Sequence, residues 1–154
     1  MRLLWRLSDW LRHRARLRRG DPRHAWGARG EDLAHRFLQK LGYVVVARNW
    51  RAEDGSGELD LVAWDGSTLV VIEVKTRASV EFGLPEEAVD GEKRSRLSRT
   101  AARYLRESDV PPSRVRFDIV SVILAKKPEI GHIRDAFSGN WQKGTDYSVP
   151  SIND

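Results

Sequence analysis

The sequence predicts one α/β domain, in which a mixed central β-sheet is flanked by helices. Two segments place apolar residues at helical spacing, and several others are rich in β-branched residues. Their order along the chain is helix, three strands, helix, long strand and short strand, which is typical of a layered fold. Residues 69–74 are almost entirely apolar, as expected of a central strand that is covered on both faces.

Length and composition limit the classes of function. A chain of 154 residues suits one domain with a workable core and room for an appendage. It has no cysteine, so disulfide bonds and thiolate chemistry are excluded, and we expect a cytoplasmic location. The four histidines are scattered without a pair at ligand spacing, which argues against a zinc site. No apolar run approaches the ~20 residues that cross a membrane, so no membrane span is expected.

The positive charge is concentrated at the N-terminus. Residues 1–26 hold eight arginines and two aspartates, whereas residues 27–154 hold 19 basic and 20 acidic residues. The first segment also has a helical apolar stripe and is interrupted at Gly20-Asp21-Pro22. This basic amphipathic arm has three interpretations: a solvated tail, a nucleic-acid contact, or a helix on a membrane surface or another protein.

Residues 27–42 predict the first helix of the domain, and Gly42 lies where a helix ends. Its expected buried face consists of Leu33, Ala34, Phe37, Leu38 and Leu41. Glu31 lies in the first turn, at the edge of this face. Its carboxylate is either a charge favoured by the helix dipole or a member of a functional site. Residues 43–50, rich in β-branched side chains, predict the strand that follows.

Residues 57–77 predict a hairpin with a tight turn. If the loop is centred on Gly66 and Ser67, antiparallel pairing places Asp60 opposite Glu73. Like charges that face each other across a sheet are unfavourable, and charges on a buried face are costly. A cation bound between the two carboxylates would remove this objection.

Glu73 and Lys75 point to the same face of the second hairpin strand, with Val74 behind them. The ordinary interpretation is a surface hairpin with a solvated ion pair at its end. The strongly apolar strand that precedes Glu73 argues against it, because such a strand is expected at the centre of a sheet. The hairpin therefore predicts a charged cluster, made of Asp60, Glu73 and Lys75, on an otherwise hydrophobic sheet.

Residues 93–107 predict a second helix with a core face of Leu97, Ala101, Tyr104 and Leu105. Basic residues repeat along it at spacings of three and four, and we call them the basic stripe: Lys93, Arg96, Arg99, Arg103 and Arg106. The stripe is either a solvated face or a surface that follows a phosphate backbone.

Residues 114–124 predict a long strand, and residues 130–137 a short edge strand. Asp118 lies within the long strand, either at a polar edge or near the carboxylates of the hairpin. The polar segment that begins at Ser138 predicts a loose tail. The expected organisation is an arm at residues 1–26, an α/β domain at residues 27–137 and a tail at residues 138–154.

The spacing of Asp60, Glu73 and Lys75 resembles the active-site signature of the PD-(D/E)xK nuclease superfamily, with Leu59-Asp60 in place of its Pro-Asp pair. Over residues 27–137 the chain more closely resembles the YraN family of bacterial proteins, which belongs to that superfamily and is similar to archaeal Holliday-junction resolvases. The matching motifs are Gly30-Glu31, Gly57-Glu58-Leu59-Asp60, Val71-Ile72-Glu73-Val74-Lys75-Thr76-Arg77, Phe82-Gly83-Leu84-Pro85-Glu86-Glu87-Ala88-Val89, Lys93 and Arg116-Phe117-Asp118-Ile119-Val120. The resemblance implies a restriction-endonuclease-like core.

Such a site would hold Mg²⁺ or Mn²⁺ on hard oxygen ligands. Asp60 and Glu73 would be the protein ligands, with the Val74 carbonyl as a third, and Lys75 would orient a water or stabilise the charged transition state. The resemblance to the resolvases adds Glu31, directly or through water. Glu58 and Arg77 are neighbouring candidates, Glu58 beside Asp60 and Arg77 as a phosphate contact.

Two functions follow from these residues. The first is a metal-dependent endonuclease acting on DNA, for which branched DNA is one candidate substrate. The second is a nucleic-acid-binding scaffold with little or no turnover. The complete set of Glu31, Asp60, Glu73 and Lys75 favours the first, because binding alone does not need both carboxylates and the lysine. DNA contacts are expected from Arg77, Lys93, Arg96, Arg99 and Arg103.

A homodimer is also expected, because a four-way junction has approximate two-fold symmetry. Apolar residues available for an interface are Phe82, Leu84, Trp50 and Trp64. The alternative is that these side chains belong to the core or stand alone on the surface.

Overall fold

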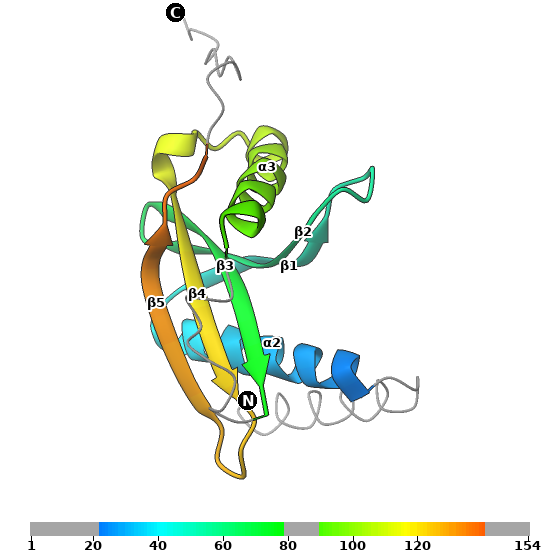
Figure 1. Cartoon of the computed structure of the whole chain (residues 1–154). Coiled ribbons are helices and arrows are strands. Elements are labelled where there is room, and N and C mark those ends of the chain that lie inside the picture. Colours follow the sequence, from blue (N-terminus) through cyan, green and yellow to red (C-terminus); the bar gives the residue numbers. More distant parts are fainter. Residues whose placement is uncertain (1–21, 79–89, 141–154) are drawn as a thin grey trace, which may run out of the picture.

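The computed structural model describes residues 22–78 and 90–140, with side chains from Ala25 onward. Within these ranges the chain forms a five-stranded sheet in the order β1-β2-β3-β4-β5 (Figure 1). The strands are β1 (Val44–Arg51), β2 (Glu58–Asp65), β3 (Thr68–Arg77), β4 (Val115–Ile123) and β5 (Glu129–Phe137). Only the pair β3/β4 is parallel among them, and the other three pairs are antiparallel. The predicted mixed sheet is confirmed.

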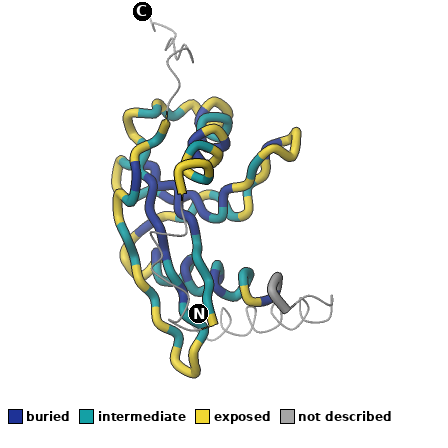
Figure 2. Tube along the Cα trace, in the orientation of Figure 1, coloured by how far each residue is buried: buried dark blue, intermediate teal, exposed yellow. Residues whose placement is uncertain are grey.

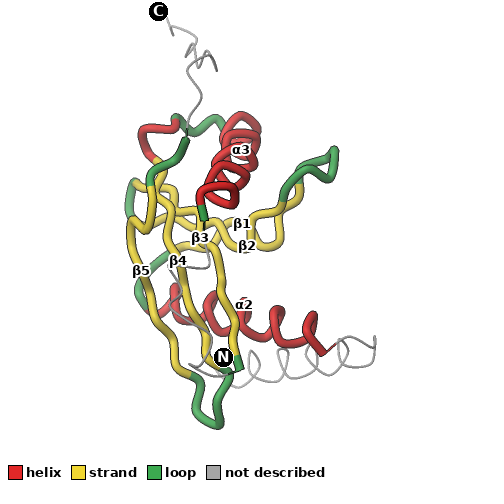
Figure 3. Tube along the Cα trace, in the orientation of Figure 1, coloured by secondary structure: helices red, strands yellow, loops and turns green. Residues whose placement is uncertain are grey.

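Two long helices cover opposite faces of the sheet, α2 (Pro22–Lys40) on one and α3 (Gly91–Ser108) on the other (Figures 1 and 3). Residues of β3 alternate between the two cores that result. Val71 packs with Leu97 of α3, whereas Val70 and Ile72 pack with Leu38 of α2. Figure 2 shows the buried backbone following the central strands, with exposed residues at the turns. This alternation explains why β3 is apolar on both faces.

Helix α2 begins at Pro22, earlier than the predicted start at Gly27, because proline is well tolerated in the first turn of a helix. It ends at Lys40, and Gly42 has a φ of +91°, as a glycine after a helix commonly does. The prediction that Leu41 is buried was wrong. Leu41 is 54% exposed, because it lies beyond the last helical turn. The domain limits given above stay a prediction, and α2 crosses the one at residue 26.

The β2–β3 hairpin has the predicted register. Asp65 pairs with Thr68 around a two-residue turn at Gly66 and Ser67, and Gly66 has the positive φ, +59°, that such turns require. The pairing continues to Leu61 and Ile72 and stops there. It therefore ends one pair before Asp60 and Glu73 would face each other.

Helix α3 connects β3 to β4. Asp90 caps its start by accepting a hydrogen bond from the Lys93 N–H (2.9 Å), and Asp109 ends it in a left-handed conformation. The predicted core residues Leu97, Ala101 and Leu105 are buried, and Tyr104 packs against the same core. A short 3-10 helix, Pro112–Arg114, precedes β4 and was not predicted.

The structure decides between the two positions considered for Asp118. It pairs with Ile72 across the parallel strands, so its side chain lies on the α2 face, and Glu73 faces the other way. The Asp118 carboxylate is buried and bonded to Arg116 (2.8 and 3.0 Å), to His132 (2.8 Å) and to the Asp135 N–H (3.0 Å). Asp118 therefore belongs to a structural network rather than to the carboxylate cluster of the hairpin.

Candidate functional site

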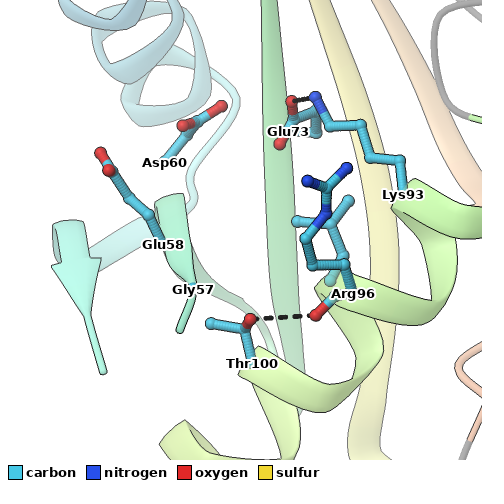
Figure 4. A pocket seen from close by; sticks show the side chains of 8 residues that line it. Gly57, Glu58, Asp60, Glu73, Lys93, Arg96 and Thr100 are labelled. Atoms are coloured by element: carbon cyan, nitrogen blue, oxygen red, sulfur yellow. Dashed lines mark hydrogen bonds and ion pairs between the residues drawn. The ribbon is translucent and has the colours of Figure 1, made fainter. Parts of the chain in front are cut away.

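Asp60 and Glu73 border two adjoining hollows. The first, of about 280 Å³, lies between the start of β2 and α3, where Lys93 and Arg96 also line it (Figure 4). The second, of about 420 Å³, lies between α2 and the end of β3, and Glu31 and Lys75 border it. The structure thus gathers the four predicted catalytic residues, Glu31, Asp60, Glu73 and Lys75, around the second hollow.

The end of the β2–β3 pairing positions Asp60. Beyond Leu61 and Ile72 the two backbones no longer pair, and the Asp60 side chain takes the place of the missing backbone acceptor. Its Oδ2 accepts a hydrogen bond from the Val74 N–H at 2.9 Å. This contact joins the first candidate carboxylate to the strand that carries the second.

Glu73 is almost fully buried, with 9% of its surface exposed. Its Oε1 contacts two ammonium groups: Lys75 Nζ at 3.2 Å and Lys93 Nζ, from the first turn of α3. Glu73 and Lys75 share a face of β3, as the strand alternation predicted. The Lys93 contact was not predicted from the sequence, where Lys93 was assigned to the basic stripe. Its ion pair with Glu73 joins α3 to the candidate site.

The electrostatics show that the carboxylates are crowded. Burial raises the pKa of Asp60 to about 7, and the negative charges of Glu73 and Glu31 act in the same direction. The Val74 hydrogen bond and the charge of Lys93 oppose this only in part. Burial and the neighbouring Lys93 lower the pKa of Lys75 below that of an ordinary lysine. For Lys93, the bond to Glu73 outweighs burial, so its pKa is raised.

Glu31 reaches the site because α2 packs tightly on the end of β3. A Cβ atom at Gly30 would lie 1.8 Å from Oγ1 of Thr76, so only glycine allows this approach. Glu31 faces the second hollow, and its Oε2 lies 3.9 Å from Arg48 Nη2 of β1. Arg48 also binds Asp32, which is 3% exposed. The Asp32–Arg48 pair was not predicted from the sequence, although two consecutive acidic residues before a helical core face were a signal.

The basic stripe divides into residues with different partners. Lys93 binds Glu73, and Arg103 binds Asp54 and the Ser56 hydroxyl (2.7 Å), which fixes the loop between β1 and β2. Arg96 and Arg99 are exposed on α3, and Arg96 borders the first hollow. Arg77 lies at the end of β3, two residues beyond Lys75. Their assignment to nucleic-acid binding stays a prediction.

Glu58 also borders the first hollow, where Figure 4 shows it beside Asp60, and it forms an ion pair with Arg51 at 3.2 Å.

Two residues proposed for a dimer interface are instead packed on the core. Trp50 and Trp64 both pack against the core under α3, and Trp50 contacts Tyr104 edge to face at 5.4 Å. Phe82 and Leu84 lie outside the described residues. The homodimer stays a prediction.

The residues of the cluster fit a hard divalent cation. Mg²⁺ and Mn²⁺ need few protein ligands because they keep several waters, so two carboxylates are sufficient. Burial and the charge of Glu73 raise the pKa of Asp60, and a cation beside the carboxylate would act in the opposite direction. Within the described ranges, no set of three or more histidine, aspartate or glutamate side chains is close enough to hold a metal. Glu31 would therefore act through water.

The fold and the site together define an α/β protein whose architecture is compatible with a restriction-endonuclease-like core. The chain belongs to the family described as "Uncharacterised protein family UPF0102", whose model matches residues 30–122. This is the YraN family that the sequence motifs indicated. None of the helices in the described ranges is both long enough and apolar enough to cross a membrane.

Curated relatives carry the same family name. A UPF0102 protein of Solibacter usitatus is 57% identical over 136 residues, which is 88% of this chain and 98% of the relative. One from Nocardia farcinica is 46% identical over 123 residues, covering 79% of this chain and 95% of the relative. One from Rhodococcus opacus is 47% identical over 115 residues, covering 73% and 96%. The relatives therefore support the family and give no named activity.

Proposed function

We propose that this protein is a Mg²⁺- or Mn²⁺-dependent endonuclease that hydrolyses phosphodiester bonds in DNA, with branched DNA among its substrates. One observation carries the proposal: Asp60 and Glu73 border the same hollows, and burial, together with the negative charge of Glu73, raises the pKa of Asp60 to about 7. A protein keeps such an unfavourable arrangement where it has a use. A bound divalent cation would make it favourable.

Each residue has a role that its position allows. Asp60 and Glu73 would hold the metal, with the Val74 carbonyl as a third ligand and Glu31 acting through water. When bound, the cation supplies positive charge for the developing phosphate oxygens and activates water. The Val74 N–H fixes the orientation of the Asp60 carboxylate, leaving its other oxygen available. Lys75 is held by Glu73, with 3.2 Å between Lys75 Nζ and Glu73 Oε1. Its ammonium group would donate a hydrogen bond to the negatively charged phosphate oxygens of the transition state.

Positioning of the DNA would fall to basic groups beside the carboxylates. Arg96 borders the first hollow from α3, and Arg77 extends the line of β3 beyond Lys75. Contacts of this kind to phosphates hold a strand in place without reading its sequence. The proposed substrate is therefore defined by its backbone and shape rather than by its bases.

A second function has one specific observation in its favour. Lys93 binds one oxygen of the Glu73 carboxylate, which is one of the two carboxylates that would hold a metal. An ammonium group in this place neutralises the carboxylate without any cation, as would suit a nucleic-acid-binding scaffold with little or no turnover.

Cleavage assays with Mn²⁺ and with Mg²⁺ separate the two functions. The substrates are a single strand, a duplex and a four-way junction, and the proteins are the parent chain, Lys75→Ala and the control Lys40→Ala, which changes an exposed lysine at the far end of α2. We expect the parent and the control to cut, and Lys75→Ala to be slower by about a hundredfold or more. If the parent cuts none of the three substrates, the scaffold function replaces the nuclease.

A further inference from the structure

Trp26 is a large aromatic residue that the core does not use. It lies in the second turn of α2, is 48% exposed and borders the second hollow together with Glu31, Glu73 and Lys75. In the described part of the chain, no aromatic ring or cation contacts its indole. Trp50 and Trp64, by contrast, pack against the core. An exposed indole at the mouth of a charged hollow is available to a ligand.

The helix geometry holds Trp26 over the end of β3. Trp26 is four residues before Gly30, so both lie on the same face of α2. Gly30 touches Thr76, which presses this face against the strand. Helical side chains lean toward the N-terminus, so the indole projects beyond the contact with Thr76. Trp26 is thus placed beside the carboxylates but outside their cluster.

We propose that Trp26 is a stacking platform for an unpaired base of a DNA strand whose phosphate lies at Asp60, Glu73 and Lys75. The choice of DNA as the bound strand rests on the proposed function. The hollow is bordered both by groups that would meet a phosphate and by a flat apolar ring. A nucleotide has the same two parts, and its base stacks on aromatic side chains without regard to sequence.

The platform narrows the substrate class. In a duplex both faces of a base are covered by its neighbours, so a stacking site can engage only a nucleotide that is unpaired or at a break in the stack. Single strands, flaps and the branch points of junctions provide such nucleotides. Arg96, which borders the adjoining first hollow from α3, has a positive charge that suits phosphates further along the strand. We therefore expect DNA with unpaired bases to be preferred over intact duplex.

Binding measured by fluorescence anisotropy in the presence of Ca²⁺ tests this inference. The proteins are the parent chain, Trp26→Ala, Trp26→Phe and the control Leu41→Ala, which truncates another exposed apolar residue beyond the opposite end of the same helix. For a single strand, we expect Trp26→Ala to weaken binding about tenfold or more, the scale for one stacked base. Trp26→Phe should stay within about threefold of the parent and Leu41→Ala should match it. Duplex binding should change less than about twofold.

An abasic site moved along the strand identifies the stacked base. At one position, removal of the base should weaken binding by the parent about as much as Trp26→Ala does, and it should have no further effect on that variant. Equal losses in both proteins at every position overturn the inference, as does a strand that the parent does not bind. A third outcome is that removal of one base weakens binding by the parent but not by Trp26→Ala, while the parent cuts no substrate. In that case the stacking site stands and the nuclease function is wrong.

Discussion

The Asp60 carboxylate bonds across to the backbone N–H of Val74, at 2.9 Å, at the point where β2 and β3 stop pairing. A side chain thus replaces the next backbone hydrogen bond of the ladder. The consequence is that the Asp60 carboxylate is fixed to β3, the strand that carries Glu73. The predictions below concern this arrangement and the charged groups around it.

Metal binding should depend on Asp60. We expect isothermal titration calorimetry to show weak binding of Mg²⁺ or Mn²⁺ by the parent and almost none by Asp60→Asn, because the variant loses one of two charged ligands. The control Asp54→Asn changes an exposed carboxylate in the loop between β1 and β2 and should bind as the parent does. Equal binding by Asp60→Asn and the parent would show that the metal site has been misplaced.

Lys93 should oppose metal binding. Its ammonium group already neutralises the Glu73 carboxylate that a cation would need, so Lys93→Met should increase the affinity for Mn²⁺. We expect an increase of about tenfold, which corresponds to about 1.4 kcal/mol. The same titration with Lys40→Met, a change at an exposed lysine, gives the reference. Weaker binding by Lys93→Met would mean that Lys93 supports the site instead.

The raised pKa of Asp60 predicts how stability depends on pH. The unfolded chain releases this proton near pH 3.8, and the folded chain retains it until about pH 7. Between these values the folded state binds more protons, so stability falls as the pH rises. Asp60→Asn has no carboxylate to ionise at this position, so its stability does not fall with pH for this reason. In EDTA at pH 8 we expect the variant to be more stable by about 2–4 kcal/mol, and at pH 4 nearly equal to the parent. Urea unfolding at both pH values measures the difference.

Asp118 should stabilise the fold without affecting the site. Its bonds to Arg116, His132 and the Asp135 N–H outweigh burial and lower its pKa, so its contribution is complete above about pH 4 and is lost as the pH falls through the lowered value. At pH 7 we expect Asp118→Asn to lose about 3 kcal/mol in urea unfolding, with the difference shrinking in acid. Metal binding should not change. A loss of metal binding in the folded variant would place Asp118 in the site after all.

The basic stripe should contribute through Arg96 and Arg99. Both are exposed, whereas Arg103 is engaged by Asp54. Replacing both residues with alanine should lower DNA affinity and reduce the slope of log K against log salt by about two units, one for each lost phosphate contact. Arg103→Ala is the matched control and should leave the slope unchanged. If the slope is the same in all three proteins, the stripe is a solvated face.

The sequence predicted the elements well because each depends on local pattern. The apolar spacing of Leu97, Ala101 and Leu105 is enough to define the core face of α3, and the tight turn at Gly66 fixes the register of the hairpin. That register already placed Asp60 near Glu73. The errors fell at element ends, such as Leu41, where one turn more or less of helix reverses the burial of a side chain.

The sequence by itself determined the α/β fold class, the family motifs and the face of β3 that carries Glu73 and Lys75, since strand alternation and turn chemistry are local. Only the tertiary structure decided which distant groups meet them. Lys93 reaches Glu73 because α3 packs against one face of the sheet, and Trp26 borders the hollow because Gly30 lets α2 touch Thr76 on the other side. These contacts depend on how α2 and α3 pack on the two faces of one strand, and a local sequence pattern does not contain that information.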